Sequence, residues 1–272
     1  MRGLHKRLSQ VNTKSSDVYV KETFQGQFTT LDVIGICRYG EFISDVVVYD
    51  FAKFFTRGRK DLYVESPAVV HTMVNVTTME VNRENVAHFM VKNSENLSWW
   101  QRLKKGWYPM CTPCTPHLHT FCSLPGQQLL LPVSVPLNDH WVLVVLFKRP
   151  GRVCIKVVDS LHWQNKQDGI HARLTAQLTM VTQLMGFTEA IVNVTEEQVV
   201  PVEQRGAYNF CGFHVLARVW MAATNQSHKW LHITHVDTMR RYIQYMTLSK
   251  EIMKHPMFGS AHIESEEEEF QL

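Results

Sequence analysis

Long hydrophobic runs are missing from this chain, and so is the apolar segment of a signal peptide. No apolar stretch of about 18 residues occurs, so no membrane-spanning helix and no membrane partner are expected. The first residues, 1–7, form no apolar segment of the kind found in a signal peptide. We therefore expect an intracellular protein, in the nucleus or the cytoplasm.

Charge of one sign is also scarce. The 28 Lys and Arg residues nearly balance the 25 Asp and Glu residues, which leaves a formal net charge of +3. Nucleic-acid binding requires clustered positive charge, and the short basic run at 102–105 is expected to be a solvated face. The sequence therefore predicts no nucleic-acid partner.

Cysteine is present, but not in the spacing of a disulfide framework. Three of the six cysteines lie between residues 111 and 122 and the others are dispersed, which indicates a reducing compartment. Zn²⁺ takes four sulfur and nitrogen ligands, and this stretch offers a set of them. Its members are Cys111, Cys114, His117, His119 and Cys122. The pair Cys111 and Cys114 lies very close to the pair His117 and His119, so we favour the alternative of a Pro-rich loop with incidental thiols. No cofactor is expected.

The composition is that of a globular protein, and the length suits one large domain or two small ones. Hydrophobic residues make up 45% of the chain and charged residues 19%, which is enough for a full core. Residues 1–28 are polar and predict a flexible arm, and 29–258 predict a single folded domain. Residues 259–272, rich in Glu, predict a solvated acidic tail.

Hydrophobic spacing predicts helices first, then the strands of a sheet in the middle of the chain, and then helices again, so the expected fold class is α+β. Helices are expected over residues 42–55, 81–91, 96–104, 170–185, 213–221 and 236–246. Strands are expected over residues 129–135, 142–147, 153–158 and 191–194. Ser44 is a suitable N-cap for the first of these helices, and Gly186 suits the end of the fourth. The β-branched residues of the first predicted helix would also suit a strand.

Four residues at the ends of predicted elements have the chemistry of a thiol acyl-transfer site. Cys211 begins a predicted helix, where a thiolate nucleophile is favoured. His140 begins a strand, and Asp159, which ends the next strand, could orient its imidazole. The side-chain amide of Gln204 could stabilise an oxyanion. Each residue alone is explained as well by a structural role, so the prediction depends on all four together.

These segments resemble the ubiquitin-like-protein protease family, which contains the SUMO (sentrin) proteases and, more distantly, adenovirus protease. That family shows a strand with His-Trp, a strand ending in Asp-Ser and a Gln shortly before Cys-Gly. The corresponding segments here are His140-Trp141, Asp159-Ser160, Gln204 and Cys211-Gly212, and the stretch 42–45 resembles the start of an early helix in the family. The resemblance spans roughly residues 31–246. It implies a papain-like fold in permuted chain order, with a central mixed sheet packed between helices.

The resemblance also implies a role for each site residue. Cys211 would be the nucleophile and His140 its general base, which later protonates the leaving amine. Asp159 would orient His140, while Gln204 and the backbone N–H of Cys211 would form the oxyanion hole. Aromatic residues of the family cover a narrow tunnel for a Gly-Gly tail. The residues expected to contact the substrate are Trp141, Phe42 and Gly212.

The chain departs from the family pattern at three positions. Phe210 stands where the family has Asp before the nucleophile. Gln204 is one residue further from Cys211 than is common, and Arg205 occupies the usual Gln position. Phe42 replaces the tunnel Trp. These differences indicate a divergent member, such as a transposon-borne, viral or pathogen protease that acts in a host cell.

The expected function is that of a thiol protease or isopeptidase that cleaves after the Gly-rich C-terminus of a ubiquitin-like protein. SUMO is preferred over ubiquitin or NEDD8 as the substrate, and polyprotein processing stays open. One alternative is a catalytically weak member that only binds a ubiquitin-like protein. Another is an acyltransferase on the same scaffold, which a basic inositol-phosphate pocket would favour. The expected partner is a ubiquitin-like protein or its conjugates, and a monomer is expected.

Overall fold

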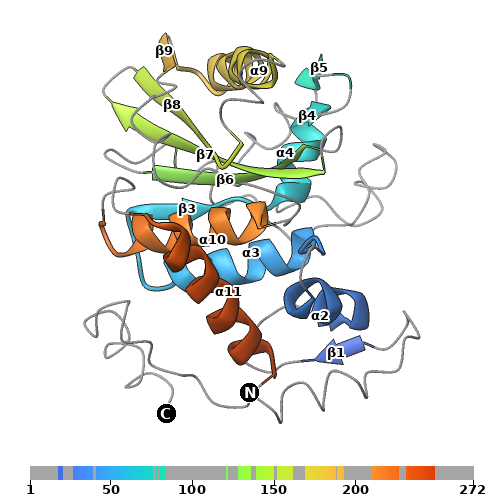
Figure 1. The fold of residues 1–272 in the computed structure, drawn as a ribbon. Coiled ribbons are helices and arrows are strands. Elements are labelled where there is room, and N and C mark those ends of the chain that lie inside the picture. Colours follow the sequence, from blue (N-terminus) through green and yellow to red (C-terminus); the bar gives the residue numbers. More distant parts are fainter. Residues whose placement is uncertain are drawn as a thin grey trace, which may run out of the picture.

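The computed structural model describes residues 18–20, 27–38, 41–75, 78, 80–83, 121, 128–135, 139–149, 152–161, 169–187, 189–192, 210–226 and 231–248. Among these residues, a central sheet lies between two layers of helices (Figure 1). The helices are α2 (Thr30–Cys37), α3 (Asp45–Thr56), α4 (Pro67–Met73), α9 (Ile170–Leu184), α10 (Cys211–Ala223) and α11 (Ile233–Leu248). None of the helices in this part of the chain is long and apolar enough to cross a membrane.

The central sheet of the described part has five strands in the order β3-β6-β7-β8-β9. Their bounds are Leu62–Val64, Gln128–Val135, His140–Arg149, Arg152–Asp159 and Glu189–Val192. The three long central strands pair antiparallel, whereas the edge strands β3 and β9 pair parallel to their neighbours. The sheet is therefore mixed, and the α+β class with a sheet between helices is confirmed.

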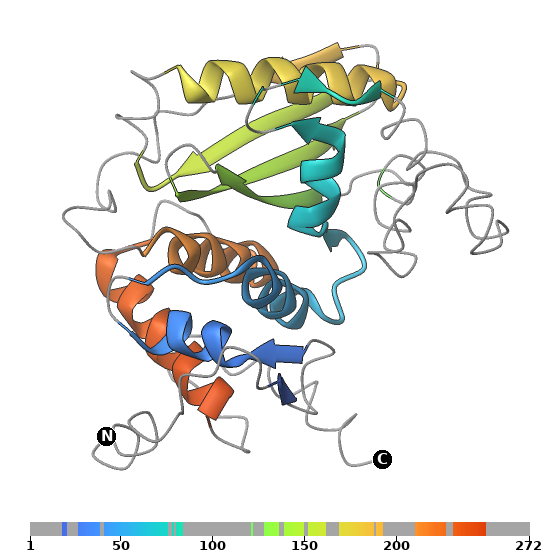
Figure 2. The same ribbon diagram turned by 90° about the vertical axis from the view of Figure 1, so that its right-hand side faces the viewer.

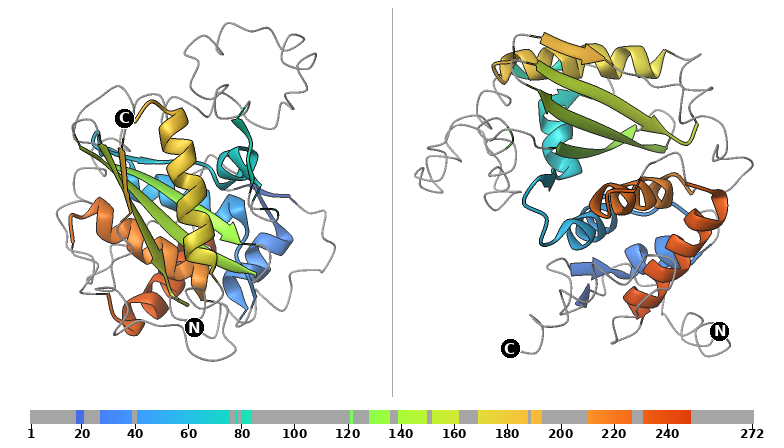
Figure 3. Two further views of the ribbon diagram at one scale, coloured as in Figure 1. Left: turned by 90° about the horizontal axis from the view of Figure 1, so that it is seen from above. Right: turned by 90° about the vertical axis from the view of Figure 1, so that its left-hand side faces the viewer.

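Strand β7 runs through the middle of the sheet and is buried because both faces are covered. Leu143 and Val145 belong to the core that α3 and α10 share with one face of the sheet. Val144 and Leu146 belong to the second core, which α4 and α9 form with the other face. Alternate side chains of a strand point to opposite faces, so a continuous apolar run is what such a strand needs. Figure 2 shows the layers on either side of the sheet, and Figure 3 shows α9 lying across it.

Two helix ends predicted from single residues are confirmed. Ser44 is the N-cap of α3, and its hydroxyl accepts a hydrogen bond from the backbone N–H of Val47 at 3.4 Å. Gly186 has a φ of 91° directly after the C-cap of α9. The N–H of the next residue, Phe187, reaches back to the carbonyl of Thr182 at 3.1 Å. This is a Schellman motif, which needs a residue that tolerates positive φ.

Other expectations need correction or fall outside the described residues. Val81 lies in strand β5 (Glu80–Val81), paired with β4 (Val74–Asn75), so the helix predicted from Val81 does not begin there. The expected arm contains strand β1 (Val18–Val20), paired with β2 (Gln27–Thr29), and Phe28 is fully buried in the core. The folded part therefore extends into the segment before residue 29. The helix predicted over 96–104 and the acidic tail at 259–272 lie outside the described residues.

Candidate active site

Cys211 is the first residue of α10, a helix that is buried along almost its whole length. The apolar residues that follow it pack against β7 and α3, so the helix is held firmly beneath the sheet. Cys211 itself is 1% exposed. The positive end of the helix dipole lies at its position, next to backbone N–H groups that no earlier turn can satisfy. A thiol and the backbone N–H groups of a first helical turn therefore occur together at one helix terminus.

His140 and Asp159 come from the adjacent strands β7 and β8. The strand register pairs Val142 with Asp159, which places His140 two residues along from the carboxylate. The Nε2 of His140 lies 2.6 Å from Oδ1 of Asp159, and the two side chains are 2% and 0% exposed. Because an ionised carboxylate only accepts hydrogen bonds, Nε2 carries the proton. Cys211 also interacts with this imidazole, and we assign that contact to Nδ1, the ring nitrogen that does not face Asp159.

The pKa of His140 reflects these two neighbours. Burial lowers it, but the hydrogen bonds with Asp159 and Cys211 and the negative charges of these residues raise the pKa of His140 to about 9. The imidazolium is thus the form that the site favours at neutral pH. The structure brings together three of the four residues expected at the catalytic centre, and Gln204 lies outside the described residues.

A second histidine, which sequence reasoning missed, also binds Asp159. His171, in the first turn of α9, places its Nε2 2.7 Å from Oδ2 of Asp159. The backbone N–H of Leu161 donates to Oδ1 at 2.8 Å, so both carboxylate oxygens are engaged. One signal was available in the sequence, because His171 falls on the same helical stripe as Leu174 and Leu178, which are buried.

Two further ionisable residues of α10 lie beneath this cluster. His214 and Arg218 follow Cys211 at helical spacing, and each is 3% exposed. Burial lowers the pKa of Arg218 to about 10, with the nearby charge of Asp159 opposing this, so the guanidinium is charged at neutral pH. Burial, Arg218 and His140 lower the pKa of His214 to about 3, so this imidazole is neutral. The positive charge of Arg218 thus acts on the buried charge of Asp159 together with the His140 imidazolium.

The residues expected to contact substrate lie around the start of α10. The indole Nε1 of Trp141 donates to the carbonyl of Ile43 at 3.1 Å, and Trp141 is 4% exposed, whereas Phe42 is 40% exposed. A Cβ on Gly212 would lie 2.4 Å from Cγ1 of Ile43. Ile43 therefore fills the space beside Gly212, so packing accounts for the glycine. Sequence reasoning assigned that space to substrate.

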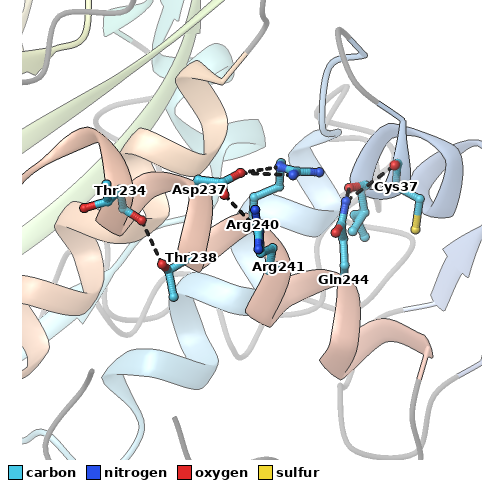
Figure 4. A network of polar contacts seen from close by, with 8 residues as sticks. Cys37, Thr234, Asp237, Thr238, Arg240, Arg241 and Gln244 are labelled. Carbon is cyan, nitrogen blue, oxygen red and sulfur yellow. Dashed lines mark hydrogen bonds and ion pairs between the residues drawn. The ribbon is translucent and has the colours of Figure 1, made fainter. Parts of the chain in front are cut away.

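Helix α11 supports the residue before the nucleophile. The guanidinium of Arg240 lies 5.7 Å from the ring centre of Phe210, and it pairs with Asp237 at 3.0 Å. Gln244, one turn further along α11, donates to a backbone carbonyl of α2 at 2.9 Å (Figure 4). A cation over an aromatic face is attractive, so Phe210 is held where the family pattern would place an Asp.

The cysteine and histidine residues considered for zinc at 111–122 lie outside the described residues.

Comparison with known proteins gives a structural match without a sequence match. No protein-family model and no curated protein matches the chain. The Ulp1 protease domain, solved in complex with SMT3, the yeast ortholog of SUMO, superposes with a TM-score of 0.52 at 12% identity. A structure of the SUMO protease Ulp1 with its catalytic cysteine oxidised to a sulfonic acid gives 0.55 at 11% identity. Each match covers 93% of this chain and 97% of the other. The resemblance expected from the sequence is therefore confirmed for the fold: the chain adopts the fold of the SUMO protease Ulp1.

Proposed function

We propose that the chain is a divergent member of the ubiquitin-like-protein protease family and acts as a thiol protease or isopeptidase. The observation that carries this proposal is the constellation at the start of α10. The Cys211 thiol lies at a helix N-terminus beside a buried imidazole, His140, which a carboxylate orients at 2.6 Å. The same fold in Ulp1 carries a catalytic cysteine. A nucleophile, a base and an orienting acid are the parts that acyl transfer to sulfur requires.

Each residue then has a defined step. The sulfur of Cys211 attacks the scissile carbonyl carbon, and the thiol proton resides on Nδ1 of His140. The negative oxygen that develops is stabilised by the backbone N–H of Cys211, with the amide of Gln204 proposed as a second donor. His140 then protonates the leaving amine as the C–N bond breaks, which leaves a thioester. Water, deprotonated by His140, attacks the thioester and releases the acid and Cys211. Asp159 holds the imidazole in the required tautomer throughout.

The proposed substrate is the Gly-rich C-terminal tail of a ubiquitin-like protein, with SUMO preferred. Ulp1, whose fold this chain shares, was solved in complex with a SUMO ortholog. The half-exposed ring of Phe42 lies next in sequence to Ile43, whose side chain packs on Gly212 beside the nucleophile. We propose that Phe42 and the neighbouring Trp141 contact the tail. Ubiquitin, NEDD8 and a viral or cellular polyprotein are the competing substrates.

Activity-based probes test this proposal directly. The purified chain is incubated with SUMO, ubiquitin and NEDD8 that each end in a propargylamide, which traps an attacking thiolate. We expect a covalent adduct with the SUMO probe that is lost in Cys211→Ala. The matched control is Cys154→Ala, because Cys154 is a half-buried free thiol on β8 that lies away from His140 and should leave the adduct unchanged.

Other results of the same experiment have definite meanings. An adduct with only ubiquitin or NEDD8 would keep the isopeptidase chemistry and change the substrate. If no probe reacts but one of the three binds without a covalent bond, the chain is a binding module and the protease proposal is wrong. An adduct that survives Cys211→Ala would remove Cys211 from its role.

A further inference from the structure

The carboxylate of Asp159 lies between two buried histidines, one on each side. His140 approaches Oδ1 from β7, and His171 approaches Oδ2 from α9, at 2.6 and 2.7 Å. We propose that His171 is a positioning residue for the reaction: it fixes the carboxylate plane of Asp159 and thereby the ring of His140 that faces Cys211. This inference rests on the proposed function for its catalytic readout.

The geometry of the pair explains why a second donor matters. A carboxylate group rotates freely enough about its terminal bond that a donor on one oxygen alone does not fix its plane. The N–H of Leu161 and Nε2 of His140 both meet Oδ1, whereas Nε2 of His171 meets Oδ2. Hydrogen bonds to an ionised oxygen are short and strong, and this one is shielded from water because His171 and Asp159 are 4% and 0% exposed. His171 therefore restrains the oxygen that His140 does not.

Helix α9 is a firm support for this histidine. The helix begins directly after Gly169, whose φ of 68° turns the chain into its first residue. Ile170 and Leu174, which flank His171 on the same helix, are buried in the core between α9 and the sheet. The hydroxyl of Thr175 donates to the backbone carbonyl of His171 at 2.7 Å. The imidazole is thus presented from a packed element rather than from a loop.

The neighbouring ionisable side chains of α10 and β7 cannot take over this task. Arg218 of α10 supplies a positive charge that acts on Asp159 through space, which favours the ionised form without fixing its plane. His214, also on α10, is neutral. His140 of β7 is the group being positioned. The direct donor from the α9 side is His171, so its removal should disturb the orientation of His140 and leave the charge balance intact.

The test compares two replacements of His171. The amide nitrogen of Gln can reach the place of Nε2, whereas Leu fills a similar volume without a donor. With a fluorogenic amide at the C-terminus of the reactive ubiquitin-like protein, we expect His171→Leu to lower kcat about 10- to 100-fold with little change in KM. His171→Gln should retain most of the wild-type kcat. The alkaline limb of the kcat/KM profile, which His140 sets, should move to lower pH in the Leu variant only.

Controls separate positioning from general damage to α9. Thr182→Val removes a local hydroxyl bond from a fully buried position of the same helix, away from Asp159, and should leave kcat and the pH profile unchanged. If His171→Leu does not fold, His171→Asn replaces it, because the shorter amide cannot reach Oδ2. Equal kcat in the Gln and Asn variants, or a Leu variant with the wild-type kcat and profile, would overturn the proposal.

A spectroscopic readout keeps this inference distinct from the proposed function. Nitrogen-15 and proton spectra of the imidazoles report how strongly the Nε2–H of His140 is hydrogen-bonded, in a protein that need not turn over. We expect a strongly hydrogen-bonded Nε2–H in the wild type and in His171→Gln, and a weakened bond in His171→Leu. If the probes fail while this pattern holds, the proposed function is wrong and the positioning role stands. If the His140 signals are the same in all three proteins, the positioning role is wrong.

Discussion

The indole of Trp141 and the backbone carbonyl of Ile43 are joined by a buried hydrogen bond of 3.1 Å. These residues are 98 positions apart in the chain, so the bond ties the strand that carries His140 to the segment that leads into α3. Both side chains also touch the position of Gly212, next to the nucleophile. The start of α10 is therefore enclosed by two elements that are themselves bound to each other.

Replacing Trp141 with Phe tests the value of this bond. Phe keeps an aromatic ring in the core but leaves the carbonyl of Ile43 buried without its donor, which typically costs about 1–3 kcal/mol. We expect the free energy of unfolding in urea to fall by that amount, with an unchanged dependence on denaturant. A loss below about 0.5 kcal/mol would show that another donor satisfies Ile43 in the variant.

Replacing Gly212 with Ala tests the contact on the other side of the nucleophile. The added Cβ would lie 2.4 and 2.6 Å from Cγ1 and Cδ1 of Ile43, which forces that side chain to move and should cost about 1–3 kcal/mol. Ile43→Ala removes both atoms and is itself destabilising. In the double variant the clash is gone. Its loss of unfolding free energy should therefore be smaller than the sum of the two single losses, by about 1–3 kcal/mol. Strict additivity in urea unfolding would contradict the packing account.

Stability should depend on pH through His140. Its pKa is raised to about 9 in the folded protein, against an ordinary value of 6.5. The folded state therefore binds this proton more tightly, and the stabilisation is complete below pH 6.5 and lost as the pH rises through 9. The full effect corresponds to about 3 kcal/mol. His140→Gln keeps a donor for Asp159 but cannot titrate, so its unfolding free energy should fall less between pH 6 and 9.5. Parallel curves for the two proteins would contradict this assignment.

The central strands and two helix caps could be predicted from local sequence patterns. The strands of 128–135, 140–149 and 152–159 are apolar runs bounded by turn residues, and the caps at Ser44 and Gly186 are set by chemistry within a few residues. Cys211, His140 and Asp159 could be predicted because each stands at the end of such an element, where a side chain is free to meet residues of other elements.

The rest depends on contacts that local patterns do not contain. His171 lies on a buried stripe, but its partner, Asp159, belongs to a different element and is met only through space. Arg218 contradicts the apolar pattern of its helix and is explained only by the buried carboxylate nearby. The short strand β5, which contains Val81, is held by pairing with β4, and that partner is not evident from the residues next to Val81. Tertiary context decides each of these cases.

The two ionisable residues beneath the site should respond in opposite ways to removal of their polar groups. Both ring nitrogens of His214 are buried and lack a hydrogen-bond partner among the described residues, so His214→Leu should be neutral or stabilising in urea unfolding. Arg218→Met has a similar shape but removes a buried positive charge that acts on Asp159, so this variant should be destabilised. Equal losses in the two variants would contradict the charge interaction between Arg218 and Asp159, because loss of packing alone would then explain both.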